Sequence, residues 1–420
     1  MNSTSNKKIW FRLLISAVFL MQLGSAAGTI GVPILAKKLF DTSLWGLAMI
    51  GITGTAVYSI VCYLIGGLVK RVNPYRMMMA GVFFFAFAFF LAIFASATWH
   101  LILIYVLAGA SAALFWPMVE AALVHGAIGN GKNKRIGVFN VSWSLADALG
   151  TAIAGGLYLI WPRLPFVVLI ICLSAAFFFS LFAGRLSRRE YGDFQPSREK
   201  KPEEREISQE VRQGFASAAW MGNFVAHGIT GVLRSLFTAP AVDVFKMSPL
   251  GIGLAIGTFN AVRTLTFALM RQRSDWTYHK GIFSSAHLVL ACGIVLIIGA
   301  AYLPSTEVAV LVVFAALALA GVGCGVIYYS SIYYSINLSE LVASHTRLHE
   351  TFLGAGATSL VLGSGGLHSL ISSPQAAALI LRMGADPLVL GSLSPFLIST
   401  IAVGGVLTLT RRLFLNRLLL

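Results

Sequence analysis

Charged side chains are scarce in this sequence. Asp, Glu, Lys and Arg make up 11% of its 420 residues, whereas a soluble domain of ordinary composition has about 25%. Hydrophobic residues account for 57%, and the mean hydropathy is +0.81. This shortage excludes an ordinary soluble protein and places the chain in the membrane class.

Acidic residues are the scarcer of the two charged kinds: there are 16 Asp and Glu against 31 Lys and Arg, which gives a net charge of +15. A nucleic-acid-binding protein gathers such charge in one patch or stripe. Here it is spread over short segments between apolar runs, so we expect no nucleic-acid partner. The four cysteines lie singly in apolar runs without metal-ligand spacing, and we expect neither a metal nor a cofactor.

Long apolar runs, by contrast, fill almost the whole chain. Only helices or closed barrels satisfy their backbone in lipid, and the alternating pattern of barrel strands is absent. We therefore expect an all-α polytopic membrane protein with twelve transmembrane helices in two pseudo-symmetric halves of six. The predicted spans are 9–36, 43–69, 77–98, 100–125, 136–161, 164–184, 214–239, 248–270, 281–303, 307–337, 348–373 and 388–410.

The distribution of Lys and Arg predicts the orientation. With the N-terminus inside, 24 basic residues lie in cytoplasmic segments and five lie on the other side. Cytoplasmic loops carry the excess of basic residues in membrane proteins. We expect both termini in the cytoplasm and an integral protein of the bacterial cytoplasmic (inner) membrane, present as a monomer in the lipid bilayer.

One long polar segment, 185–213, divides the spans into six and six. It is mixed in charge and poor in apolar residues, which predicts a cytosolic linker between an N-terminal half, 1–184, and a C-terminal half, 214–420. The halves are related in sequence: "LAG" at 107–109 recurs at 319–321, and Arg135 and Arg347 have the same offset of 212. Repeated halves are a common way to build a transporter.

The segment "GGLVKRVNPYR" (66–76), between spans two and three, resembles the loop motif of the major facilitator superfamily. Arg71 and Arg76 match its basic positions, Lys70 replaces its usual Asp, and Asn73 replaces its second Gly. The resemblance implies the superfamily's fold and a gating loop that includes Lys70, Arg71 and Arg76. It also implies that spans one, four, seven and ten line a cavity and that spans five and eight meet.

Asp147 is the most unusual residue of the predicted spans, because a charge near the bilayer midplane costs at least ~2.5–3.5 kcal/mol. Asn140, Ser144 and Thr151 share its helix face. Arg263 in span eight lies at similar depth. Given the resemblance, we expect Asp147 and Arg263 to pair across the interface between the halves. A purely structural bond and a role toward substrate or protons both stay open.

Other polar residues at depth are candidates for binding substrate or protons. Trp116 and Glu120 in span four are cavity candidates by resemblance, although Glu120 could instead extend to a loop cation such as Arg135. Tyr329 and Tyr333 in span ten are candidates for an aromatic platform. The remaining candidates are Gln22, His227 and Arg234, for which structural roles are the alternative. Glu350 is expected in the first turn of span eleven, where it complements the helix dipole.

These features predict a secondary active transporter that moves a small organic solute by alternating access, with proton coupling as an open possibility. The alternative is a non-transporting membrane sensor or scaffold on the same fold. Neither a phosphate-binding G-x-x-x-x-G-K-[ST] loop nor an H-E-x-x-H motif is present. The sequence therefore disfavours an ATP-driven pump and an enzyme.

Overall fold

The computed structural model describes residues 3–65, 72–124, 130–192, 208–273, 275–338 and 342–418, and these residues fold as helices without a strand. The helices α1 to α6 are Ser3–Leu39, Leu44–Ile65, Pro74–Ala92, Thr98–Val124, Asn130–Ile160 and Leu164–Tyr191. The helices α7 to α11 are Gln209–Ser235, Thr238–Asp243, Pro249–Gln272, Lys280–Ala300 and Thr306–Leu338. The helices α12 to α15 are Val342–Ile371, Pro374–Arg382, Pro387–Ser392 and Ser394–Leu418.

Twelve of these described helices have 19 or more residues, long enough at 1.5 Å per residue to cross most or all of a ~30 Å hydrocarbon core. Ten also meet a simple test of apolar composition; α7 and α12 do not. Those two helices carry His227 and Arg234, and His349 and Glu350, which face the protein interior. The twelve-span architecture predicted from the sequence is confirmed.

The two halves repeat one packing scheme. In the first half, α1 packs on α5 and α6, α4 packs on α2 and α3, and α3 packs on α6. In the second half, α7 packs on α12 and α15, α11 packs on α9 and α10, and α10 packs on α15. The same pairs recur when α1 to α6 are matched with α7, α9, α10, α11, α12 and α15, which is the predicted pseudo-symmetry.

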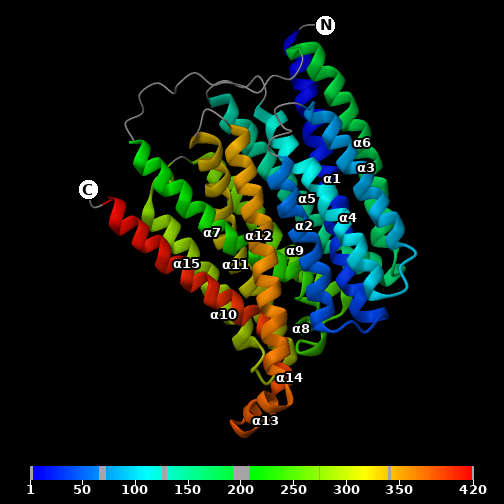
Figure 1. The fold of residues 1–420 in the computed structure, drawn as a ribbon, viewed down its shortest axis with the longest axis vertical. Helices are drawn as coiled ribbons and strands as arrows, with labels where there is room; N and C mark the ends of the chain where they lie inside the picture. Colours follow the sequence, from blue (N-terminus) through cyan, green and yellow to red (C-terminus); the bar gives the residue numbers. More distant parts are fainter. Residues whose placement is uncertain are drawn as a thin grey trace.

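The halves meet along two helix pairs, α5 with α9 and α2 with α12. Figure 1 shows α2 and α12 side by side in the middle of the bundle. Small residues bring α5 and α9 close together: a Cβ on Gly253 would lie 2.8 Å from the Thr151 carbonyl, and one on Gly257 would lie 2.8 Å from the Ala152 Cβ. Gly253 and Gly257 form a G-x-x-x-G pair of the kind that lets membrane helices approach closely.

The bundle has two distinct ends. We call the end where α1 begins the N-terminal end, and the end that carries α8, α13 and α14 the far end (Figure 1). Several helices begin with a side-chain cap followed by proline, as expected for helix starts. Asn73 caps α3, so the residue that replaces the motif glycine accepts from the backbone N–H of Tyr75. Ser248 caps α9 in the same way through Gly251.

Two boundaries differ from those expected. The linker predicted at 185–213 overlaps the last turns of α6, which ends at Tyr191, and the first turns of α7, which begins at Gln209. The last span, predicted at 388–410, is not one helix: α14 ends at Ser392 and α15 begins at Ser394. Pro374 and Pro387 each follow a side-chain cap and start the short helices α13 and α14, which the apolar pattern alone did not separate.

Candidate functional site

Asp147 lies near the middle of α5 and is fully buried. Its Oδ2 accepts a bond of 2.6 Å from Arg263 of α9, and its Oδ1 accepts one of 2.5 Å from Arg234 of α7. Gln22 of α1 donates to the same Oδ1 at 2.7 Å. The carboxylate therefore has two cationic partners from the second half and a neutral one from the first.

The predicted contact between Asp147 and Arg263 is confirmed. Arg234 was predicted as a candidate for binding substrate or protons, with a structural role as the alternative, and the structure pairs it with Asp147. Gln22, predicted separately as a polar candidate, donates to the same carboxylate. We call Asp147, Arg234 and Arg263 the charged triad.

Polar and aromatic side chains surround the triad along α5 and α9. Trp143 lies under the guanidinium of Arg263, with the Arg263 Cζ 4.9 Å from its ring centre, a favourable cation–π distance. The Trp143 indole donates to Asn140 at 3.1 Å. Ser144 bonds Thr264 at 2.7 Å, so the polar face predicted on this helix meets protein from the other half. Asn140 itself is fully buried.

A cavity of about 210 Å³ lies between the halves. It takes lining residues from both: α1, α2, α3, α4 and α5 on one side, and α7, α11 and α12 on the other. Four of the residues predicted from the sequence line it, namely Gln22, Trp116, His227 and Arg234. The His227 Nδ1 is buried without a hydrogen-bond partner.

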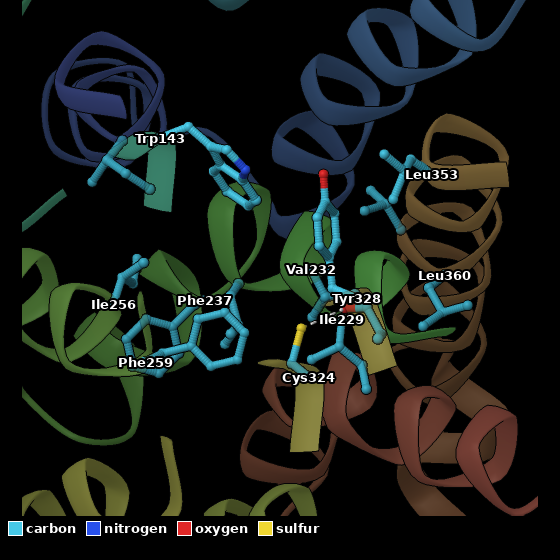
Figure 2. Close-up of a cluster of buried hydrophobic side chains, with 14 of the residues drawn as sticks. Trp143, Ile229, Val232, Phe237, Ile256, Phe259, Cys324, Tyr328, Leu353 and Leu360 are labelled. Carbon is cyan, nitrogen blue, oxygen red and sulfur yellow. Dashed lines mark hydrogen bonds between the residues drawn. The ribbon is translucent and has the colours of Figure 1, made fainter. Parts of the chain in front are cut away.

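The tyrosines of α11 divide differently from the prediction. Tyr328 lines the central cavity, and Figure 2 shows its ring with Trp143 on one side and Leu353 on the other. Its ring centre lies 5.1 Å from that of Trp143. Tyr329 and Tyr333 instead line a separate pocket at the N-terminal end and pack on Trp276. Adjacent helix residues point about 100° apart, and the paired spacing did not reveal which member faces inward.

A second buried cluster lies at the side of the cavity toward the N-terminal end. Glu120 of α4 and Glu350 of α12 come from different halves and are 1% and 3% exposed. One carboxyl oxygen of each lies within 4.8 Å of the other, and the Tyr58 hydroxyl of α2 donates to Glu350. Glu120 Oε2 has no partner of its own. We call Glu120, Glu350 and Tyr58 the carboxyl cluster.

Two sequence interpretations change here. Glu120 is buried against Glu350 and does not extend outward into solvent. Glu350 is not in the first turn of its helix, because α12 begins at Val342, two turns earlier. The expected start of the apolar run at 348 placed Glu350 too close to the end. Tyr58 was missed altogether, since one tyrosine within an apolar span carries no distinguishing pattern.

Among the described residues, one group offers three potential metal ligands, and it includes both glutamates of the carboxyl cluster. One ligand atom each from Glu120, His349 and Glu350 lies within 4.8 Å of the others. The His349 Nδ1 lies 2.9 Å from the Ser331 hydroxyl and 3.4 Å from the Asn223 amide nitrogen, whereas its Nε2 is buried without a hydrogen-bond partner.

Contacts between the halves occur on both sides of the cavity. Toward the N-terminal end, the Ser59 hydroxyl donates to the Thr351 carbonyl at 2.9 Å, beside the carboxyl cluster. At the far end, Lys37 and Asp243 form an ion pair of 3.2 Å, and α5 touches the start of α9 at Gly155. The halves are therefore joined by one set of contacts toward each end of the bundle, with the cavity between the two sets.

The gating-loop prediction can be followed only in part. Lys70 and Arg71 lie outside the described residues. Arg76 lies in the first turn of α3 and is exposed.

Two pseudo-symmetric halves of six long helices, enclosing a cavity with buried charges at their interface, define the class of polytopic membrane transport proteins. A sequence profile of the Major Facilitator Superfamily matches residues 13–357, and the chain belongs to this family. The comparison with curated proteins gives no match.

Solved structures show the same fold. Two are crystal structures of a bacterial homolog of the human lysosomal transporter Spinster, in inward-facing occupied and inward-facing unoccupied conformations. The first has a TM-score of 0.66 at 15% sequence identity, with 97% of each chain covered. The second has a TM-score of 0.65 at the same identity, with 97% of this chain and 98% of the other covered.

Proposed function

We propose that this protein is a secondary active transporter, which moves a small organic solute by alternating access between its two halves. The central cavity supports this proposal most directly. It lies between the halves, takes side chains from both, and has contacts between the halves on either side. Breaking one set while keeping the other exposes the cavity to one side of the membrane at a time.

The cavity volume favours a small solute. At about 210 Å³ it is below the ~300–1,000 Å³ usual for sites of drug-sized ligands. Its polar groups include Gln22, Thr230 and Arg234, and its walls include Trp116 and Phe139. A few polar groups among apolar walls are typical of sites that bind and orient organic molecules.

The orientation and boundaries are part of the proposal. We place the N-terminal end at the cytoplasm and the far end outside, in a bacterial inner membrane; the excess of basic residues supports this orientation. The two moving bodies are 1–184 and 214–420, joined through 185–213. The gating loop with Lys70, Arg71 and Arg76 lies on the cytoplasmic side in this arrangement.

We also propose that transport is coupled to protons through the carboxyl cluster. One carboxyl oxygen of Glu120 and one of Glu350 lie within 4.8 Å of each other, and a carboxylate only accepts hydrogen bonds, so a bond between the two groups requires a shared proton. Sharing it lets Glu120 and Glu350 join the halves, whereas two buried anions repel. The neighbouring titratable groups are Tyr58 and Cys62 of α2, His349 of α12 and Tyr328 of α11. Asp147, by contrast, is neutralised by arginine.

Site-directed accessibility tests alternating access. In a variant whose four cysteines are replaced, Ala112→Cys introduces a thiol into the cavity. In oriented proteoliposomes, a membrane-impermeant maleimide added to either side is expected to label it. Ile171→Cys, on an exposed apolar surface of α6, is the control and stays unlabelled in the bilayer.

Labelling of Ala112→Cys from one side only, at every pH and with every solute tried, would overturn alternating access and favour the sensor alternative.

Thermal unfolding of the wild-type protein with sugars, amino acids, organic anions and drugs then selects solutes that bind, because binding raises stability by mass action. Flux of a selected solute into proteoliposomes completes the test.

A further inference from the structure

The charged triad does not neutralise itself. Asp147 supplies one negative charge, while Arg234 and Arg263 supply two positive charges that arginine keeps at all ordinary pH values. Gln22, the fourth member of this hydrogen-bonded group, is neutral. One net positive charge is therefore left at the interface of the halves, where an unbalanced charge is costly.

The surplus charge faces the cavity. Asp147 and the Arg263 side chain are buried, with exposures of 0% and 1%, whereas the Arg234 side chain is 27% exposed. Arg234 is also the member of the triad that lines the cavity. Its Nη2 bonds Asp147, but its Nε is buried without a partner. The guanidinium thus has unused capacity on a group that reaches the cavity.

No free anion within the described cavity lining offsets Arg234. Among the described lining residues, the one carboxyl group is that of Glu350, which accepts from Tyr58 and lies beside Glu120 on the side toward the N-terminal end. The cavity walls also include the apolar and aromatic side chains of Met21, Trp116 and Trp143. Near its middle, the cavity therefore combines a guanidinium that shares its one carboxylate with Arg263 and surfaces suited to an apolar group.

We propose that the central cavity binds a small organic monoanion, with its carboxylate or similar anionic group against Arg234 and its apolar body against Trp116 and Trp143. This inference rests on the proposed transport function and names its substrate class. Guanidinium groups match the geometry of carboxylates and bind them by charge-assisted hydrogen bonds. A neutral sugar or a cationic drug leaves the extra charge unbalanced, and a cation is repelled by it.

Such a substrate also engages the interface of the halves. Arg234 belongs to the second half and Asp147 to the first, so their bond links the two. An anion that takes over part of Arg234 weakens this link while Arg263 still holds Asp147. Substrate binding is thereby connected to the contact that the halves must rearrange.

Matched sets of solutes that differ only in charge test the inference. The probes are benzoate, benzamide and benzylammonium, together with butyrate, butyramide and butylammonium. They are added to the purified full-length protein, and binding is measured by thermal shift and by calorimetry. We expect the anion of at least one set to bind and its neutral and cationic partners to bind at least about tenfold more weakly.

Substitution of Arg234 supplies the second arm. Arg234→Gln is expected to weaken binding of the anion at least about tenfold, and Arg234→Lys is expected to restore part of it. Arg382→Gln removes an exposed cation of α13 and serves as the matched control, with unchanged binding. If Arg234→Gln does not fold, Arg234→Lys and the charge preference of the wild-type protein still decide the question.

Equal or tighter binding of the amides or ammonium ions would overturn the inference, as would the absence of binding by every anion to well-folded protein. Flux of the bound anion is measured separately in proteoliposomes. Anion binding that depends on Arg234, without any flux, supports the site and contradicts the transport function. Flux of neutral solutes without anion binding supports the transport function and contradicts the anion site.

Discussion

Asp147 forms ion pairs with both Arg234 and Arg263, so the three members of the charged triad are not equivalent. Removal of Arg263 leaves Asp147 bonded to Arg234 and Gln22. Removal of the Asp147 charge leaves two guanidinium groups without their carboxylate. Breaking a buried ion pair on one side typically costs about 3–5 kcal/mol, because the remaining charge stays buried and unpaired.

We therefore expect Asp147→Asn to lower the free energy of unfolding by about 3–5 kcal/mol, and by more than Arg263→Gln does. Thermal or denaturant unfolding in detergent measures both. The double variant Asp147→Asn/Arg263→Gln should recover part of the loss, since one unpaired cation disappears. Equal and small effects in all three variants would mean that the triad is not a structural element.

Asp243 offers the matched control for this substitution. It pairs with Lys37 at 3.2 Å, but its side chain is 41% exposed. Exposed ion pairs contribute about 0–1 kcal/mol because water screens them. Asp243→Asn should thus change stability by no more than about 1 kcal/mol, and a cost as large as that of Asp147→Asn would show that any acid-to-amide change is harmful here.

The carboxyl cluster predicts a dependence on pH. In the proposed coupling, a shared proton holds Glu120 and Glu350 together at low pH, and its loss as pH rises leaves two anions beside each other. Spin labels at Lys8→Cys and Lys280→Cys, one at the N-terminal end of each half, report this opening by pulsed EPR. The distance between the labels is expected to increase with pH in the wild-type background.

In Glu120→Gln the amide replaces the protonated carboxyl, so the short distance should persist at high pH. Glu210→Gln changes an exposed acid in the first turn of α7 and should leave the wild-type pH response intact. A response that is the same in wild type and Glu120→Gln would assign the pH sensitivity to another group.

At the scale of the elements, α5 and α9 meet almost backbone to backbone. A Cβ on Gly155 would lie 1.9 Å from the carbonyl oxygen of Pro249, which begins α9 at the far end. The next residue, Gly156, has far more room, because its Cβ would meet only Leu250 Cδ1, at 3.7 Å. An added methyl group therefore clashes with α9 at Gly155 but fits at Gly156.

Gly155→Ala is expected to push α5 and α9 apart at the far end and to increase labelling of Ala112→Cys from that side of the membrane. Overpacking of this kind typically costs about 1–3 kcal/mol, which thermal unfolding also detects. Gly156→Ala should change neither quantity noticeably. If both variants behave alike, the close approach at Gly155 does not control access to the cavity.

The elements also show what a single sequence can predict. Apolar runs revealed the twelve long helices, because a membrane imposes length and composition on every span. Helical spacing placed Asn140, Ser144, Asp147 and Thr151 on one face, and that face is buried. The spacing did not distinguish Tyr328 from Tyr329, since the direction of a face depends on how the helix is rotated in the bundle. Glu350 was misplaced because α12 extends beyond its apolar run.

At the scale of the whole molecule, α1 begins and α15 ends toward one end of the bundle, away from α8, α13 and α14 (Figure 1). In the proposed orientation, which rests on the excess of basic residues, that end faces the cytoplasm. We expect cysteines at Lys8 and Lys280 to be labelled only from the cytoplasmic side of intact cells or vesicles. A cysteine at Arg382, at the far end, should be labelled only from outside. The reverse pattern would invert the proposed orientation.

The relation between the halves was predictable in outline, and the partners within it were not. A resemblance of motif and architecture suggested that spans five and eight meet, and charge made Asp147 and Arg263 natural partners. Predicting the third member, Arg234, would have required the position of α7 relative to α5. The link between Glu120 and Glu350 needed the position of α4 relative to α12. Such distances arise from packing of the two halves on each other, which no local pattern encodes.

The depth of the triad has a mechanical consequence. Asp147 lies 13 residues from the end of α5 at Ile160, an arm of about 20 Å at helical rise. If the triad is a fulcrum, a tilt of about 15° moves the tip of such a lever by about 5 Å. One end of the bundle then opens wide enough to admit a small molecule, while the distances between Asp147 and its two arginines change little. With the fulcrum at mid-depth, the two halves tilt against each other without exposing the buried charged side chains to lipid.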